Sequence, residues 1–156
     1  MNAFTRTIAA GAAAGAAGTT ALNAITYLDM AIRARPASST PEESARRLAH
    51  AIGTDIPGDD EQKQNRAAGL GPLLGLGAGI GIGALAAAAR ALGWRPGRAA
   101  GIAATTTAVL LAANAPMTLL KVTDPRTWSA ADWASDILPH LGYGIVADAV
   151  LRALEA

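Results

Sequence analysis

Residues 69–93 read GLGPLLGLGAGIGIGALAAAARALG, and this glycine-rich stretch decides the fold of the chain. Four of its glycines are spaced four residues apart, at positions 71, 75, 79 and 83. A glycine inside a water-exposed helix costs about 1 kcal/mol relative to alanine, so another interaction must offset that loss. Helices in lipid associate through close van der Waals packing, which small residues permit. The spacing therefore predicts a transmembrane helix with one packing ridge, while Gly77 and Gly81 form a second small face for another neighbouring helix.

Charge is absent from three long windows of the sequence. Residues 7–28, 67–89 and 99–120 contain no Asp, Glu, Lys or Arg. A soluble amphipathic helix carries charge on its outer face every turn or two, and these windows have no such face. About 20 apolar residues are enough to span the hydrocarbon core of a bilayer. The windows predict membrane spans over residues 7–32, 67–92 and 98–120.

A fourth apolar segment, ILPHLGYGIVADAVL, covers residues 137–151. It predicts a span over 137–154 that begins near Pro139, since proline suits the first turn of a helix or a kink. The alternative is an interfacial helix that lies on the membrane. With four spans, the predicted fold is all-α: an integral membrane four-helix bundle that forms a single domain over residues 1–156.

The segments between the spans carry helix-start signals. In TPEE, Thr40 is expected to cap a helix, with Pro41 at its first position and Glu43 reaching back as a capping box. This predicts a short amphipathic surface helix over residues 41–52, followed by a polar loop over 53–65. Ser129, with Asp132 three residues later, predicts the capped start of a second short helix, which the last span follows.

The N-terminal run imitates a signal peptide, with one Arg, an apolar stretch and small residues. Its uncharged window continues past Thr19 to Leu28, which is long for a cleaved signal. We therefore expect a retained first helix, with cleavage as the alternative. Gly11, Gly15 and Gly18 give this helix a small ridge of its own. The predicted packing positions are Gly11, Gly15, Gly71, Gly75, Gly79 and Gly83.

Composition narrows the classes of function. The net charge of +1 gives no sign of a nucleic-acid partner. The chain has no Cys and two His, a weak basis for a metal site. No nucleophile motif, phosphate-binding loop or HExxH motif is present. We therefore expect no enzymatic activity, no catalytic residues, no metal and no cofactor.

Polar residues at membrane depth are the candidate functional positions, because they are costly there. His140, Tyr143 and Asp148 lie on roughly one side of the fourth span, which suggests a proton relay or a polar lining. The structural alternative is that they lie near the interfaces and bond neighbouring helices. Asp29 is expected to pair with Arg33. The candidate polar membrane site is Asp29, His140, Tyr143 and Asp148, with Asn23 and Asn114 as bonds between helices.

Three stretches resemble the YagU-like family of small bacterial inner-membrane proteins. They are GAAAGAAGTTALNAITYLDMAIR from position 11, RPASSTPEESARRLAHAIG from position 35 and ILPHLGYGIVADAVLRAL from position 137. Their order is similar: a Gly/Ala helix ending near Arg-Pro, a short amphipathic helix and a closing helix with HLxYG. The resemblance covers under half of the chain and departs in the second span, where another His or Tyr is expected. It implies a four-helix protein of the bacterial inner membrane and no particular activity.

Two functions remain after this reading. The first is a structural or accessory membrane protein that lies in the lipid bilayer and assembles, with itself or a larger complex, through glycine-rich helix packing. The alternative is a small transporter or channel subunit with a polar path near His140 and Asp148. The glycine ridges favour the first function, and the ionisable residues favour the second.

Overall fold

The computed structural model describes residues 2–155, and its regular elements over that range are all helices. They are α1 (Ala3–Arg33), α2 (Thr40–Ala51), α3 (Asp60–Ala91), α4 (Arg98–Leu119), the 3₁₀ turn η1 (Pro125–Thr127) and α5 (Ala130–Glu155). The predicted all-α bundle is confirmed. Helices α1, α3, α4 and α5 are each long and apolar enough to cross a membrane, which indicates a multi-pass membrane protein.

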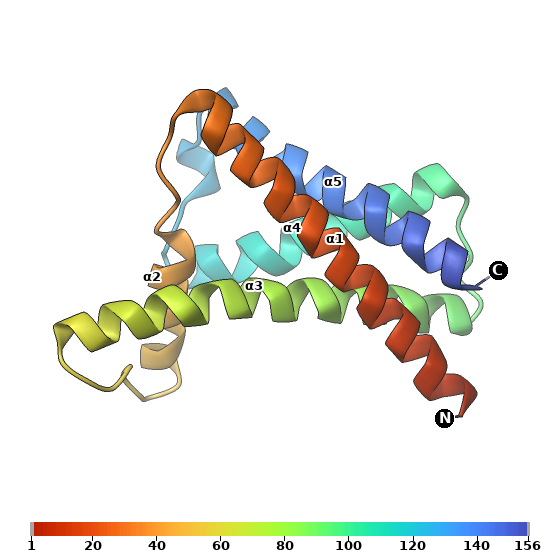
Figure 1. Cartoon of the computed structure of the whole chain (residues 1–156), viewed down its shortest axis with the longest axis horizontal. Coiled ribbons are helices and arrows are strands. Elements are labelled where there is room, and N and C mark those ends of the chain that lie inside the picture. The colour runs from red at the N-terminus through yellow and green to blue at the C-terminus, as the bar shows by residue number, and fades with distance from the viewer. Residues whose placement is uncertain (1, 156) are drawn as a thin grey trace.

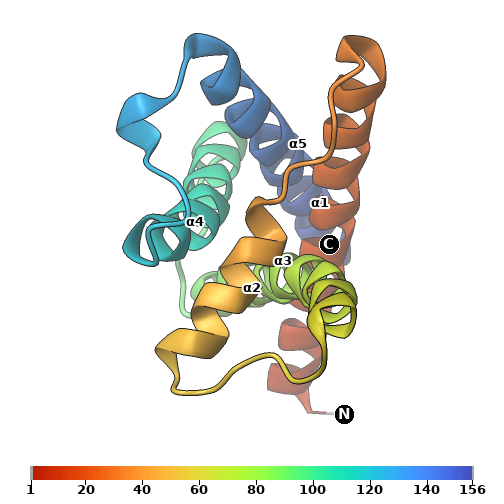
Figure 2. The ribbon, with the colours of Figure 1, turned by 90° about the vertical axis from the view of Figure 1, so that its left-hand side faces the viewer.

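Helices α1 and α5 pack against each other at the centre of the bundle, and α3 and α4 pack against them from outside. Helix α1 packs on both α3 and α5, α4 packs mainly on α5, and the short α2 packs on α3. Both chain ends and the α3–α4 connection lie at one end of the bundle (Figure 1). The segments around α2 and η1 lie at the other end, and Figure 2 views the molecule from that side. This arrangement is the one that four membrane crossings require, because both chain ends and the connection between the second and third spans then lie on the same side.

The buried centre of the bundle is built from small residues. Ala14, Ala87 and Leu151 form one cluster between α1, α3 and α5, and Tyr143 is the one large aromatic in a second cluster with Val109 and Ala147. Many Leu and Ile side chains point outward instead. This distribution suits a lipid solvent, in which hiding large apolar side chains gains little and close backbone approach gains more.

Helix α3 begins earlier than predicted. Residues 60–65, predicted as part of a polar loop, belong to its first turns, and the Asp59 side chain caps them by accepting a hydrogen bond from the Gln62 N–H (2.9 Å). The prediction was wrong because it took the edge of the uncharged window as the helix start. Charged residues such as Glu and Lys are good helix formers and continue the helix outside the bilayer. For the same reason α1 begins at Ala3, where Asn2 caps it.

Helix α2 lies close to the predicted range, but its predicted cap is wrong. Thr40 is the first helical residue rather than the cap, and the preceding Ser39 makes no side-chain capping bond. The Glu43 carboxylate accepts from Arg47 Nε at 2.6 Å instead of reaching back to the helix start. An ion pair with a neighbouring turn therefore replaces the capping box.

Helix α5 is continuous from Ala130 to Glu155, with Pro139 inside it. The predicted start is confirmed, because the Ser129 N–H donates to the Asp132 carboxylate (2.9 Å) and the Asp132 N–H donates to Ser129 Oγ (3.2 Å). The short helix predicted after Ser129 is therefore not separate: it is continuous with the fourth span, which gains seven residues at its start. Its length and apolar composition favour a membrane crossing over the interfacial alternative.

Candidate functional site

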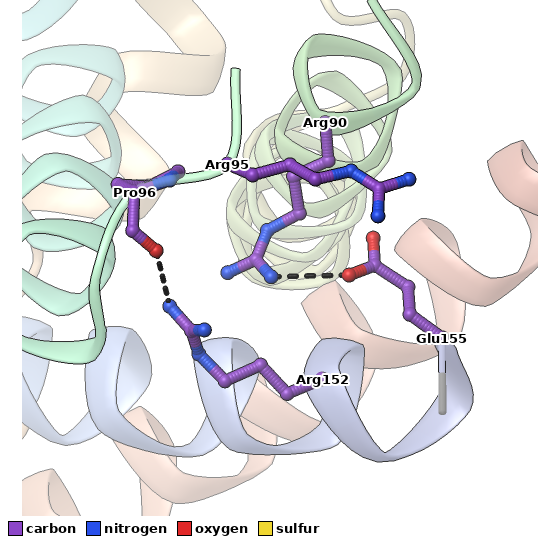
Figure 3. Close-up of a pocket in the computed structure, with 5 residues that line it drawn as sticks. All are labelled: Arg90, Arg95, Pro96, Arg152 and Glu155. Carbon is purple, nitrogen blue, oxygen red and sulfur yellow. Dashed lines mark hydrogen bonds and ion pairs between the residues drawn. The ribbon is translucent and has the colours of Figure 1, made fainter. Parts of the chain in front are cut away.

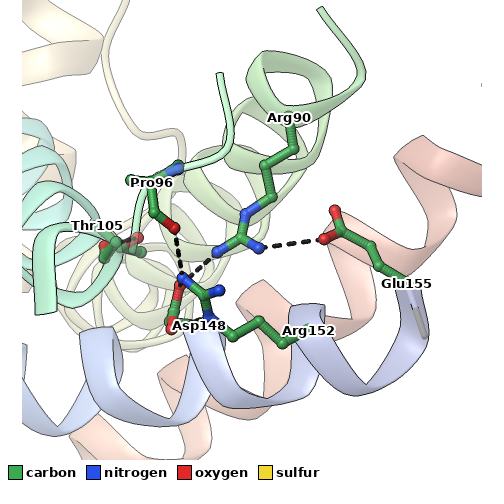
Figure 4. A network of polar contacts seen from close by, with 7 residues as sticks. Arg90, Pro96, Thr105, Asp148, Arg152 and Glu155 are labelled. Carbon is green, nitrogen blue, oxygen red and sulfur yellow. Dashed lines mark hydrogen bonds and ion pairs between the residues drawn. The ribbon is translucent and has the colours of Figure 1, made fainter. Parts of the chain in front are cut away.

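A network of charged side chains lies inside the bundle near the chain ends (Figure 4). Its centre is Asp148 of α5, whose side chain is 0% exposed. One carboxylate oxygen pairs with the guanidinium of Arg90 from the end of α3. The other oxygen accepts from Arg152 Nε at 2.7 Å, one turn further along α5. The carboxylate is therefore held by two guanidinium groups from two helices.

The network continues from Arg90 and Arg152 to the surface. Arg90, with 6% of its side chain exposed, also pairs with the Glu155 carboxylate at 3.1 Å. Arg152 donates to the backbone carbonyl of Pro96 in the α3–α4 connection, at 3.0 Å. Two positive and two negative side chains thus neutralise one another. Removing one partner of a buried pair is costly, because it leaves the other charge uncompensated.

Sequence reasoning found Asp148 but missed its partners. The spacing of four between Asp148 and Arg152 is a helix-pair signal that could have been used. Arg90 directly follows the uncharged window 67–89, so the prediction treats it only as the charged end of the span over residues 67–92. No spacing rule brings together two residues that are 58 positions apart. Arg90 and Asp148 meet only because the fold places the end of α3 beside α5.

A second polar cluster joins α4 and α5 toward the opposite end. His140 Nδ1 lies 2.6 Å from the backbone carbonyl oxygen of Asp136 and 3.5 Å from its carboxylate. The same carboxylate accepts from Asn114 Nδ2 at 2.8 Å. The predicted bond from Asn114 to a neighbouring helix is therefore present, through an acidic residue that the sequence reading did not single out. The Asn114 side-chain oxygen is buried and has no hydrogen-bond partner among residues 2–155.

Tyr143 ties α5 to α3. Its hydroxyl donates to the backbone carbonyl of Gly79 at 2.6 Å, in a buried position. The three predicted residues His140, Tyr143 and Asp148 are all buried on α5. Each of them binds a different partner, and across residues 2–155 no hydrogen bond joins one of the three to another. Their arrangement is that of three separate contacts between helices.

Asp29 and Asn23 lie in α1, away from these clusters. The predicted pair of Asp29 with Arg33 is present at 3.4 Å, and Arg35 adds a shorter contact of 2.5 Å to the same carboxylate. Arg33 also donates to Ser135 Oγ (2.6 Å) and so links α1 to α5. Asn23 is exposed and makes no side-chain hydrogen bond within residues 2–155, so its predicted bond to a neighbouring helix is wrong for the single chain.

The glycine positions divide into covered and open ones. Where α1 crosses α3, a Cβ atom on Gly11 would lie 2.6 Å from Ala87 Cβ, and one on Gly83 would lie 2.6 Å from Gly15 Cα. Gly79 lies at the same crossing, against Thr19 and Tyr143, and Gly71 lies against Pro41 of α2. A Cβ on Gly75 would meet nothing within 4 Å. The predicted ridge of four therefore packs at three positions and leaves a gap at Gly75, between the contacts with α2 and α1.

The second small face of α3 has no neighbour in this chain. A Cβ added at Gly77 or Gly81 would meet no atom of residues 2–155 within 4 Å. The neighbouring helix predicted for this face is therefore not one of the helices that the structure describes in this chain. The contacts of α1, α2 and α5 are made at other glycines of α3, namely Gly71, Gly79 and Gly83.

Comparisons with protein-family models, curated proteins and solved structures give no match to this chain. The resemblance to the YagU-like family stays a prediction. Within residues 2–155, no group of three or more His, Cys, Asp and Glu side chains is placed to hold a metal ion.

Proposed function

We propose that this chain is a small accessory membrane protein that assembles with another membrane chain through the uncovered glycine face of α3. The observation that carries the proposal is the open space at Gly77 and Gly81. These glycines have no packing role within the chain, although each weakens a helix relative to alanine. A partner helix that packs closely against them would account for their presence.

The surroundings of these glycines support the same role. Gly77, Gly81 and Ala88 follow one another at spacings of four and seven, so they line one strip of the helix. Ala84 lies at the edge of this strip, next to Gly11 of α1. Exposed leucines lie beside the strip at positions 73, 74 and 85, and the exposed Leu70 lies in line with it, two turns before Gly77. A strip of small residues between larger ones forms a shallow groove that admits the backbone of a second helix.

The buried charges give less support to the transporter or channel alternative. Asp148 and Arg90 neutralise each other, and His140 is held by Asp136 of its own helix. A path for ions needs polar groups that connect along the membrane normal, and these clusters use different partners at separate depths of α5. In the proposed role they fix the helices that present the α3 face. By the resemblance above, the membrane is the bacterial inner membrane.

The proposal is tested with the variant Gly77→Leu/Gly81→Leu, which fills the groove without touching the packed side of α3. The control is Ala103→Leu, which adds the same side chain at an exposed position of α4. Tagged proteins extracted from native membranes in mild detergent are weighed by native mass spectrometry. We expect a multi-chain species for the unaltered protein and the control, and the single-chain mass for the double variant. A multi-chain species that survives in the double variant, or is absent from the unaltered protein, contradicts the proposal.

A further inference from the structure

A pocket of about 340 Å³ opens at the end of the bundle that carries both chain ends. Figure 3 shows its lining: Arg90 from α3, Arg95 and Pro96 from the α3–α4 connection, and Arg152 and Glu155 from α5. Three guanidinium groups therefore converge on one opening from three segments of the chain.

Two of the three arginines are held in place before any ligand arrives. Arg90 is fixed by Asp148 below the pocket and by Glu155 at its rim, and Arg152 is fixed by Asp148 and the Pro96 carbonyl. Guanidinium groups that are already ordered lose little conformational freedom when they bind an anion.

The third arginine adds a further positive charge to the lining of the pocket. Arg95 is exposed and forms no ion pair with any of residues 2–155. Among residues 2–155, the carboxylates that pair with the arginines of the pocket are Asp148 and Glu155. The Glu155 carboxylate lies 3.1 Å from Arg90 with its side chain 36% exposed, near the end of α5. An incoming anion can take this place on Arg90, because the Glu155 side chain has room to turn outward.

The position of the pocket along the bundle points to lipid. Arg90 directly follows the uncharged window 67–89 of α3, so the pocket lies where the hydrocarbon region ends. Trp94, in the same connection, is 49% exposed, and exposed Trp side chains favour the membrane interface. Arginine groups at this depth meet lipid phosphates, and guanidinium binds phosphate with two parallel hydrogen bonds.

We infer that this pocket binds the phosphate group of an anionic phospholipid, with Arg95 and Arg90 as its contacts and Glu155 as the group it displaces. The inference is independent of the α3 glycine face, which lies elsewhere on the molecule.

The test is native mass spectrometry of the full chain in mild detergent, with phosphatidylglycerol or phosphatidylcholine added stepwise. We expect tighter binding of phosphatidylglycerol. Arg95→Gln should weaken it by about fivefold, the effect of one arginine near a lipid surface. Glu155→Gln should strengthen it, because the competing carboxylate is gone. Arg126→Gln, which removes an exposed arginine that pairs with Asp124 at the opposite end, should leave it unchanged.

Three results would overturn the inference. Equal binding of the two lipids would remove the anion preference. Equal weakening by Arg95→Gln and Arg126→Gln would show general attraction rather than a site. Complete displacement of phosphatidylglycerol by inorganic phosphate at millimolar concentration would assign the pocket to free phosphate instead of lipid.

Discussion

Asp148 is the residue most constrained by its surroundings. Its carboxylate is fully buried between two arginines of different helices, and one of them, Arg90, is almost fully buried as well. A buried ion pair adds little net stability compared with apolar side chains of the same size. Its effect is on specificity: a charged Arg90 tolerates only an arrangement of α3 and α5 that supplies a carboxylate at this point.

Asp148→Asn should lower the free energy of unfolding by about 3–5 kcal/mol, because it leaves the Arg90 charge without its buried partner. The double variant Arg90→Met/Asp148→Leu should recover most of that loss, since both charges are removed together. Unfolding by SDS in detergent micelles, followed by tryptophan fluorescence, measures both. Glu155→Gln is the control, with a loss below about 1 kcal/mol because the pair is partly exposed. Equal losses for Asp148→Asn and Glu155→Gln would contradict the argument.

At the scale of elements, glycine sets how closely α1 and α3 cross. The crossing uses Gly11 and Gly15 of one helix against Gly79 and Gly83 of the other, with backbone atoms where side chains would otherwise lie. Gly75 belongs to the same spacing of four but falls in the gap between α2 and α1. Glycine is thus required for close packing at Gly83, whereas at Gly75, two turns earlier, it packs against nothing.

Gly83→Ala should destabilise the protein by about 1–3 kcal/mol, because its Cβ would press on the backbone of α1 and force the helices apart. Gly75→Ala should stabilise it by about 0.5–1 kcal/mol, because the Cβ meets open space and alanine is the better helix former. The same SDS unfolding measurement compares the two. A change of the same sign at both positions would show that the crossing is not limited by backbone contact.

The sequence predicted the elements better than their ends and their partners. The uncharged windows located the spans because a bilayer requires uniform apolarity over a fixed length. The start of α3 was missed because helical hydrogen bonding continues where apolarity stops, and only the Asp59 cap marks it. The partners of Asp148 and His140 were missed because nothing in the sequence distinguishes Arg90 and Asp136 from other charged residues at helix ends. Their roles become visible only when α3, α4 and α5 are packed together.

The whole molecule has two ends of different character. One carries both termini, the α3–α4 connection and the arginine pocket, while the other carries α2, η1 and the charged first turns of α3. Four membrane crossings would place these two ends on opposite sides of the bilayer.

Single cysteines test this topology directly, because the chain has none of its own. Thr54→Cys lies in the exposed segment after α2, and Gly97→Cys lies in the exposed connection before α4. A membrane-impermeant maleimide applied to intact spheroplasts should label one of them and leave the other for labelling only after lysis. Labelling of both in intact spheroplasts would place the two segments on one side and exclude four crossings.

The distance in sequence between Arg90 and Asp148 also orders the events of biosynthesis. The two residues are 58 positions apart, so at ordinary rates of translation Arg90 leaves the ribosome roughly 3–12 s before its counter-ion. During that interval the third helix has an arginine at its end and no carboxylate to meet it, and the long side chain must reach toward the headgroups. The ion pair between Arg90 and Asp148 therefore forms only after the last helix has entered the membrane, and until then the α3 end of the bundle lacks this contact.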